Sequence, residues 1–133
     1  TEEIQQRHPE VKSTVLGLKS DQTFGKKNFA LSWWPISEPF EMVSEPHAHD
    51  FDQFLIFVGG DINNMPDLGG EVELTLGEEK GKLEKFVFTK ATAVYIPAGL
   101  FHCPLNFKKV NNPAKPILFH DFFFAREYKR KGT

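Results

Sequence analysis

The sequence has a single cysteine, no long apolar run and almost no net charge, and each shortage excludes a class of protein. Cys103 alone cannot form an internal disulfide, which suits a reducing compartment. No apolar run approaches the length of a membrane-spanning helix. A net charge of −2 and a pI near 6.2 give no basic surface for nucleic acid. We therefore expect neither a membrane nor a nucleic acid as a partner.

The polar first residues show no signal peptide, so we predict a cytoplasmic protein. The length of 133 residues fits one domain, and a hydrophobic content of 40% supports a core. Residues 1–25 are expected to form an N-terminal arm or strand, and residues 26–128 the folded core.

Aromatic residues and turn signals predict an all-β fold. Fourteen phenylalanines crowd into short segments, aromatic residues favour strands, and no segment has a sustained helical period. Glycine and proline punctuate the chain at close intervals, which is typical of a sandwich or barrel of short strands. The predicted strands are residues 28–36, 47–60, 71–79, 80–90, 91–99, 101–110 and 117–127.

Two histidines stand at the start of one of these predicted strands. Side chains alternate between the faces of a strand, so His47, His49 and Gln53 should share one face, with Asp50 and Asp52 on the other. The first face continues into apolar side chains, Phe51, Leu55 and Phe57, which are candidate walls of a substrate pocket. Buried polar groups need partners, and one metal ion would satisfy all three. The alternatives are solvated histidines at a strand end, or a Gln53 that only hydrogen-bonds a ligand histidine.

A third histidine, His102, follows a Pro-x-Gly turn far along the chain. Three imidazoles and one oxygen donor form a ligand set for zinc, iron, nickel, manganese or copper. Imidazole must be neutral to bind a metal, so metal affinity should fall in mild acid.

The two histidine segments resemble the paired motifs of the cupin superfamily. H-x-H-x3-Q-x6-G, from His47 to Gly60, is similar to the first motif, with Gln53 where cupins have glutamate. P-x-G-x2-H-x3-N, from Pro97 to Asn106, is similar to the second. The resemblance implies a single-domain double-stranded β-helix, or jelly-roll barrel. It also implies one divalent metal (zinc, iron, nickel or manganese) bound by His47, His49, Gln53 and His102, and a homodimer.

A glutamine ligand carries no charge, so a divalent metal beside three imidazoles would keep its full charge. Bound water should then be more acidic, and an anionic ligand should be favoured. A glutamine ligand is seen among cupins that resemble polyketide cyclases, and this favours Lewis-acid chemistry of the cyclase, isomerase, lyase or hydrolase type on a small anionic substrate. The alternatives are a non-haem iron dioxygenase and a non-catalytic small-molecule-binding cupin.

Four further residues have weaker interpretations. Tyr95 is a candidate general acid or pocket wall, and His120 is a candidate proton carrier or extra ligand, although a packed structural histidine is the simpler interpretation. Asn106 is a candidate pocket residue or strand-end hydrogen-bonder. Cys103 directly follows His102, so in an extended chain its thiol should point away from the site and be buried and inert.

Overall fold

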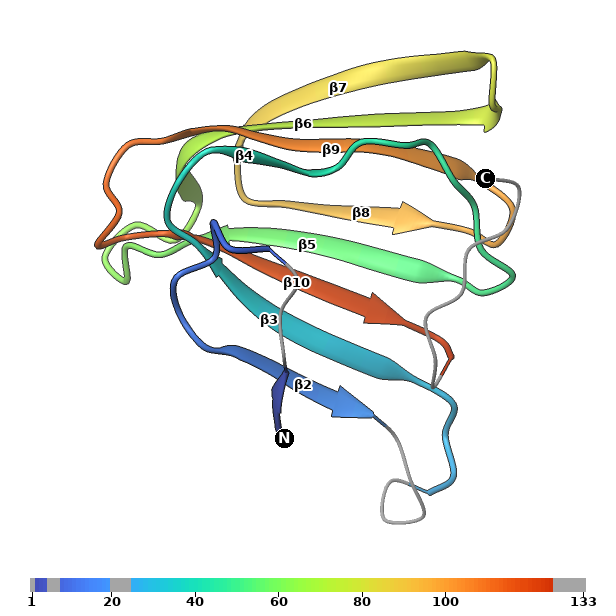
Figure 1. The fold of residues 1–133 in the computed structure, drawn as a ribbon, viewed down its shortest axis with the longest axis horizontal. Helices are drawn as coiled ribbons and strands as arrows, with labels where there is room; N and C mark the ends of the chain where they lie inside the picture. Colours follow the sequence, from blue (N-terminus) through green and yellow to red (C-terminus); the bar gives the residue numbers. More distant parts are fainter. Residues whose placement is uncertain (1, 5–7, 20–24, 126–133) are drawn as a thin grey trace.

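Two antiparallel sheets face each other in the structure (Figure 1). The computed structural model describes residues 2–4, 8–19 and 25–125, and this part of the chain contains ten strands and no helix. None of the described segments is therefore a helix that could cross a membrane. The prediction of an all-β fold is confirmed.

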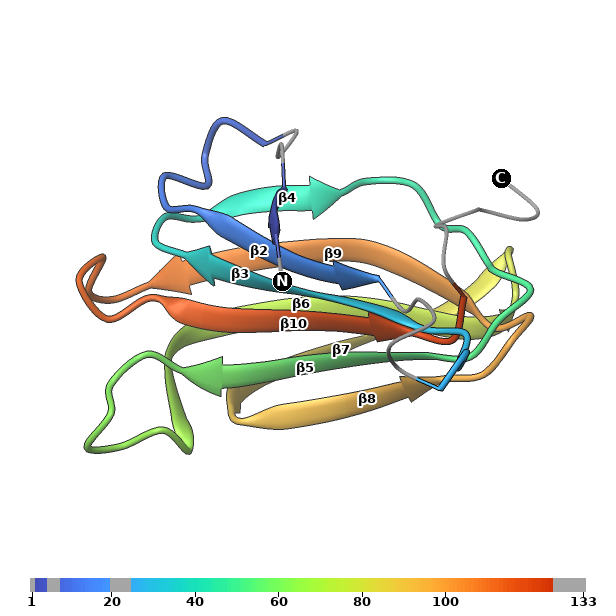
Figure 2. The same cartoon turned by 90° about the horizontal axis from the view of Figure 1, so that it is seen from below.

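Six strands form the larger sheet in the order β1-β2-β3-β10-β5-β8. Figure 2 shows β2, β3, β10, β5 and β8 side by side in front of strands of the other sheet. Their bounds are Glu2–Ile4 for β1, Val15–Lys19 for β2, Ala30–Ile36 for β3, Gln53–Gly59 for β5, Thr92–Ile96 for β8 and Ile117–Phe123 for β10.

Four strands form the smaller sheet in the order β4-β9-β6-β7. Their bounds are Phe40–Val43 for β4, Asp67–Glu79 for β6, Lys82–Lys90 for β7 and Phe101–Val110 for β9.

The core lies between the sheets because inward-facing apolar residues alternate along β5 and β6. Leu55 and Phe57 are buried on β5, and Val72 and Leu74 on β6. The ring of Phe57 contacts aromatic rings from both sheets, which are Phe88, Phe107 and Phe119. The concentration of phenylalanine in the sequence therefore reflects a core of interlocking rings.

One predicted strand begins later than expected. The sequence predicts one strand over residues 47–60, but β5 begins at Gln53, and His47 takes part only in an isolated bridge. Ala48 is as deeply buried as the histidines on either side of it, so alternation does not apply to this stretch. The prediction that His47 and His49 lie on a regular strand is wrong. Residues 126–127 of the last predicted strand, and the predicted core boundary at residue 128, lie outside the described residues.

The connections collect at the two ends of the sandwich (Figure 1). The β4–β5 and β8–β9 connections lie at one end, and the β5–β6 and β9–β10 connections at the other. The first end brings together the two histidine segments, which are far apart in the sequence.

Candidate metal centre

Backbone hydrogen bonds join the two histidine segments directly. The amide of His47 donates to the carbonyl of His102 at 3.0 Å, and the amide of His102 donates back at 2.9 Å. Next to this bridge, the Gly99 amide donates to the His49 carbonyl at 2.9 Å. The Ala98 amide donates to Oδ1 of Asp52 at 2.9 Å. The backbone therefore fixes the two segments relative to each other without help from the imidazoles.

The turn before His102 depends on glycine. The Leu100 amide donates to the Pro97 carbonyl at 3.1 Å, and Gly99 has a φ of 89°. A positive φ at the third residue of a turn favours glycine, because residues with a Cβ are strained in this conformation. The predicted Pro-x-Gly turn is thus present, and β9 starts two residues later.

Three imidazoles converge at this end of the sandwich, all of them buried. The ring centroid of His47 lies 4.3 Å from that of His102 and 4.8 Å from that of His49. The centroids of His49 and His102 are 5.0 Å apart. The relative exposure of the three residues is between 0% and 2%. The rings are therefore close together and dry, but the ligand atoms that lie within 4.8 Å of one another are those of His47, His102 and Cys103, a group that does not include His49.

Two of these rings, those of His47 and His102, are each held by a hydrogen bond at their own Nδ1 atom. Nδ1 of His47 lies 3.0 Å from the Glu45 carbonyl oxygen, and Nδ1 of His102 lies 3.1 Å from the Leu100 carbonyl oxygen. A carbonyl only accepts, so Nδ1 must carry the proton in these bonds, which leaves the lone pair on Nε2. Such contacts fix the tautomer and orientation of metal-binding histidines.

Gln53 lies at the start of β5 and is 2% exposed. Its Nε2 donates to Oδ1 of Asp121 on β10 at 2.6 Å. Its Oε1 is buried and accepts no hydrogen bond from the described residues. Because the amide nitrogen is held by Asp121, the oxygen is the atom left to meet a ligand or a metal.

Asp121 is a functional candidate that the sequence interpretation does not include. Burial raises the pKa of its carboxyl to about 6, while the hydrogen bond from Gln53 lowers it. A signal for it exists in the sequence, because strand alternation puts Asp121 on the same face as the buried Phe119 and Phe123. A carboxylate on an apolar face is a candidate for a buried polar contact.

Cys103 does not point away from the site, so that part of the prediction is wrong. Ligand atoms of His47, His102 and Cys103 lie within 4.8 Å of one another, a group that could hold a metal. Cys103 has a φ of 82°, and the register between β6 and β9 shifts where His102 pairs with Leu76 and Leu105 with Leu74. One extra residue on β9 is a bulge, which breaks alternation and lets consecutive side chains face inward.

The predicted apolar walls lie inside the sandwich. Phe51 stacks on His49 with centroids 4.5 Å apart and an interplanar angle of 11°. It also contacts Phe123, at 5.2 Å. Leu55 and Phe57 continue the same side of β5 into the core. Of the three, Phe51 is the one that packs directly against a histidine of the cluster.

The structure does not bring Tyr95 to the histidines. Tyr95 pairs with Phe54 across β8 and β5, stacks on its ring at 5.1 Å and is 52% exposed. Loss of hydration and the nearby Asp52 carboxylate raise its pKa. Phe54 alternates with the buried Gln53 and Leu55, so Tyr95 belongs to the outer face of the six-stranded sheet.

His120 and Asn106 also lie on outer faces. His120 lines a groove of about 370 Å³ over β2, β3 and β10, with Trp33, Trp34 and Leu118 among its neighbours. Loss of hydration lowers the pKa of His120. Asn106 alternates with the buried Leu105 and Phe107, and its register partners are Glu41 and Glu73.

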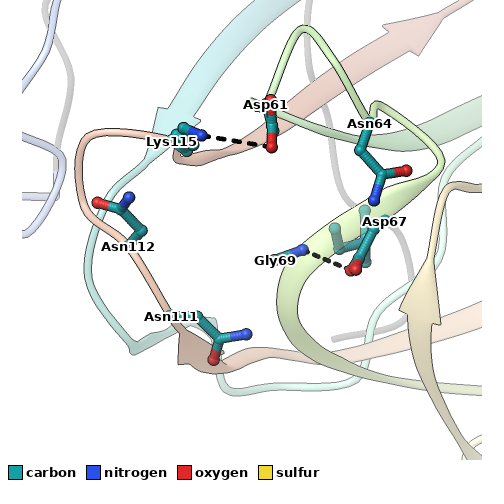
Figure 3. A pocket seen from close by; sticks show the side chains of 8 residues that line it. Asp61, Asn64, Asp67, Gly69, Asn111, Asn112 and Lys115 are labelled. Carbon is teal, nitrogen blue, oxygen red and sulfur yellow. Dashed lines mark hydrogen bonds and ion pairs between the residues drawn. The ribbon is translucent and has the colours of Figure 1, made fainter.

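A second, polar pocket of about 100 Å³ lies at the opposite end of the sandwich (Figure 3). Asp61 there forms an ion pair with Lys115 at 3.4 Å, and Asp67 accepts a hydrogen bond from the Gly69 amide. These carboxylates already have protein partners, so the pocket is explained by the packing of two loops.

No family model and no curated protein matches this chain. Solved structures do. Two mutants of oxalate decarboxylase OxdC from Bacillus subtilis match 99% of this chain, with a TM-score of 0.61 and 17% identity. A structure concerned with the Mn(II) centres of the same enzyme matches 90% of it, with a TM-score of 0.58 and 18% identity. The matches cover only 27% to 30% of those enzymes, so this chain spans less than a third of their length. The TM-scores establish a shared fold, and at an identity this low they establish the fold alone.

Proposed function

We propose that this chain, which has the cupin fold of a double-stranded β-helix, binds one divalent transition metal at its histidine cluster. The proposed function is Lewis-acid chemistry on a small anionic organic molecule. The proposed ligands are His47, His49, His102 and the amide oxygen of Gln53. The observation that carries the proposal is the convergence of three buried imidazoles whose centroids are 4.3 to 5.0 Å apart.

The residues present fit a metal ion. His47 and His102 have their Nδ1 atoms occupied by carbonyls, so each can offer Nε2. The buried Oε1 of Gln53 lacks a donor among the described residues, and a cation would supply the missing partner. Neutral nitrogen and oxygen donors suit zinc, iron, nickel and manganese.

A metal bound here would supply Lewis acidity, polarising a carboxylate or carbonyl oxygen of the substrate. The protein would orient the metal ligands and keep water away from them. Asp121 holds the amide of Gln53 so that its oxygen stays available, and Phe51 packs flat against His49. Histidine and glutamine are neutral ligands, so the positive charge of the site is left for an anion to balance.

The solved structures support this proposal by analogy. Oxalate decarboxylase, as its name states, acts on oxalate, a small dianion, and its Mn(II) centres are named with one of its structures. A decarboxylase is a lyase, which is one of the four reaction types expected from the sequence. The cytoplasmic location and the homodimer stay predictions of the sequence.

Two alternatives use the same fold and the same cluster. In a non-haem iron dioxygenase, turnover would need ferrous iron and oxygen. In a non-catalytic binding cupin, a small anion would bind without being changed. Protein loaded separately with zinc, manganese and ferrous iron distinguishes the three when it is incubated with a panel of small carboxylates, with and without oxygen.

Anaerobic turnover of a carboxylate, lost in His47→Ala and kept in His120→Ala, is the expected result. His120 is a matched control because it lies in the outer groove, away from the cluster. Turnover that requires both iron and oxygen would replace the proposal by the dioxygenase. Metal-dependent binding with no turnover across the panel would replace it by the binding module.

A further inference from the structure

Cys103 is a buried thiol at the histidine cluster, and no role in the proposed function has been given to it. We propose that its Sγ is a metal ligand together with His47 and His102. This inference rests on the proposed metal site and adds to it a sulfur donor that alters the charge and the metal preference of the site.

The separations allow one ion to touch all three side chains. Their ligand atoms lie within 4.8 Å of one another. Zinc binds imidazole nitrogen at about 2.1 Å and thiolate sulfur at about 2.3 Å, so in its tetrahedral geometry two such ligand atoms are about 3.4 to 3.7 Å apart. Metal binding would therefore draw the most widely separated pair of ligand atoms together by up to about 1 Å.

The backbone of β9 is shaped so that two consecutive residues face inward. A regular strand would put Cys103 on the outer face when His102 is inside. Instead Cys103 has a φ of 82°, which is uncommon for a residue with a Cβ, and both residues are 2% exposed. Backbone conformations of this kind concentrate at functional sites.

A thiolate ligand would change the charge of the site. Gln53 provides no negative charge, and its buried Oε1 accepts no hydrogen bond from the described residues, so a cation would satisfy it. Thiol coordination releases the sulfur proton to solvent and leaves a thiolate on the metal. Cys103 would therefore supply the single negative charge that a glutamate at position 53 would otherwise provide, and one positive charge of a divalent metal would remain for an anionic substrate to balance.

The sulfur ligand also predicts which metal is preferred. Thiolates are soft ligands that select zinc or Cu(I), whereas manganese prefers oxygen donors. We expect this chain to take zinc in preference to the Mn(II) named with oxalate decarboxylase.

Cobalt(II) substitution tests the proposal with a readout other than activity. A Co(II)–thiolate bond gives an intense near-ultraviolet charge-transfer band, and Cys103 is the only cysteine, so no other residue can produce it. Metal-free protein is titrated with Co(II) in four forms: wild type, Cys103→Ser, Cys103→Ala and His120→Ala. Cooperative melting of each variant verifies that it is folded.

The expected result is the band in wild type and His120→Ala, and its loss in both Cys103 variants while the weaker visible bands persist. Zinc affinity should then fall by more than the about 10- to 100-fold that loss of an outer-shell partner causes. Visible bands without the charge-transfer band in wild type would overturn the role of Cys103 and leave the proposed function standing. No Co(II) binding by wild type would overturn both.

Discussion

Gln53 and Asp121 form a side-chain pair through a hydrogen bond of 2.6 Å, and this pair sets the chemistry of the site at the residue scale. The amide nitrogen needs an acceptor, and the carboxylate of Asp121 provides it. The amide oxygen then accepts no hydrogen bond from the described residues, and for this reason it is the atom proposed to bind the metal. Glutamine and aspartate thus act as one unit, although they come from different strands.

The pH dependence of stability should report on Asp121 in metal-free protein. Burial raises its pKa from 3.8 to about 6, so the folded state holds this proton more tightly than the unfolded chain. The stabilisation that the protonated Asp121 carboxyl contributes is fully present below its pKa in the unfolded chain. It is lost as the pH rises through its folded-state pKa of about 6. The shift corresponds to at most about 3 kcal/mol. Denaturant unfolding of wild type and Asp121→Asn from pH 4 to 8 measures it.

The free energy of unfolding of wild type, minus that of Asp121→Asn, should decrease over that pH range and then level off. The subtraction removes the titration of the other carboxyl groups, which both proteins share. A difference that is flat, or that increases with pH, would show that the Asp121 carboxyl is not held protonated by burial.

Replacing Gln53 with glutamate should expose the cost of a second carboxylate. The introduced carboxylate would face Asp121 across the present hydrogen bond, and two neighbouring carboxylates cannot both ionise easily. We expect metal-free Gln53→Glu to be less stable than wild type at pH 8 by about 1–3 kcal/mol and nearly as stable at pH 5. Denaturant unfolding at the two pH values measures the difference.

The double variant Gln53→Glu/Asp121→Asn is the matched control, because it restores one donor and one acceptor. It should regain most of the stability at pH 8. Equal stability of wild type and Gln53→Glu at both pH values would mean that residues 53 and 121 are not coupled.

At the scale of the elements, the β8–β9 turn and the bulge in β9 position His102 and Cys103. The turn is predictable from the sequence, because Pro97 and Gly99 are its characteristic residues. The bulge is not, because it depends on which residue of β6 each residue of β9 pairs with. The prediction for Cys103 fails for that reason, since alternation assumes an unbroken ladder.

Gly99→Ala tests how far the turn controls the site. A Cβ at Gly99 would meet no atom within 4 Å, so the cost comes only from the φ of 89°. An L-residue in the left-handed region costs about 1–2 kcal/mol, which thermal or denaturant unfolding can measure. Metal affinity should fall as well, because the turn leads directly into His102.

Gly81→Ala is the control for that variant. It also lies in a turn with open space around it, and no left-handed φ constrains it. Its stability and metal affinity should match those of wild type. If Gly99→Ala behaves like Gly81→Ala, the turn does not need glycine, and the turn does not limit the placement of His102.

At the scale of the whole molecule, the sandwich brings together two segments that the sequence separates widely. The all-β class is predictable, because phenylalanine-rich alternating segments and closely spaced turns are local signals. The convergence of His47, His49 and His102 is predictable only through the paired motifs. The partnership of Gln53 with Asp121 is not, because the register between β5 and β10 is set by packing over the whole sheet.

The metal content of the protein tests the central claim most directly. Wild type, His47→Ala/His102→Ala and His120→Ala are purified without added metal or chelator, and bound metals are measured by elemental analysis. The account predicts one divalent transition metal per chain in wild type and His120→Ala, and almost none in the double variant. Wild type that contains no metal, and whose melting is unchanged when zinc, manganese or iron is added, would contradict it.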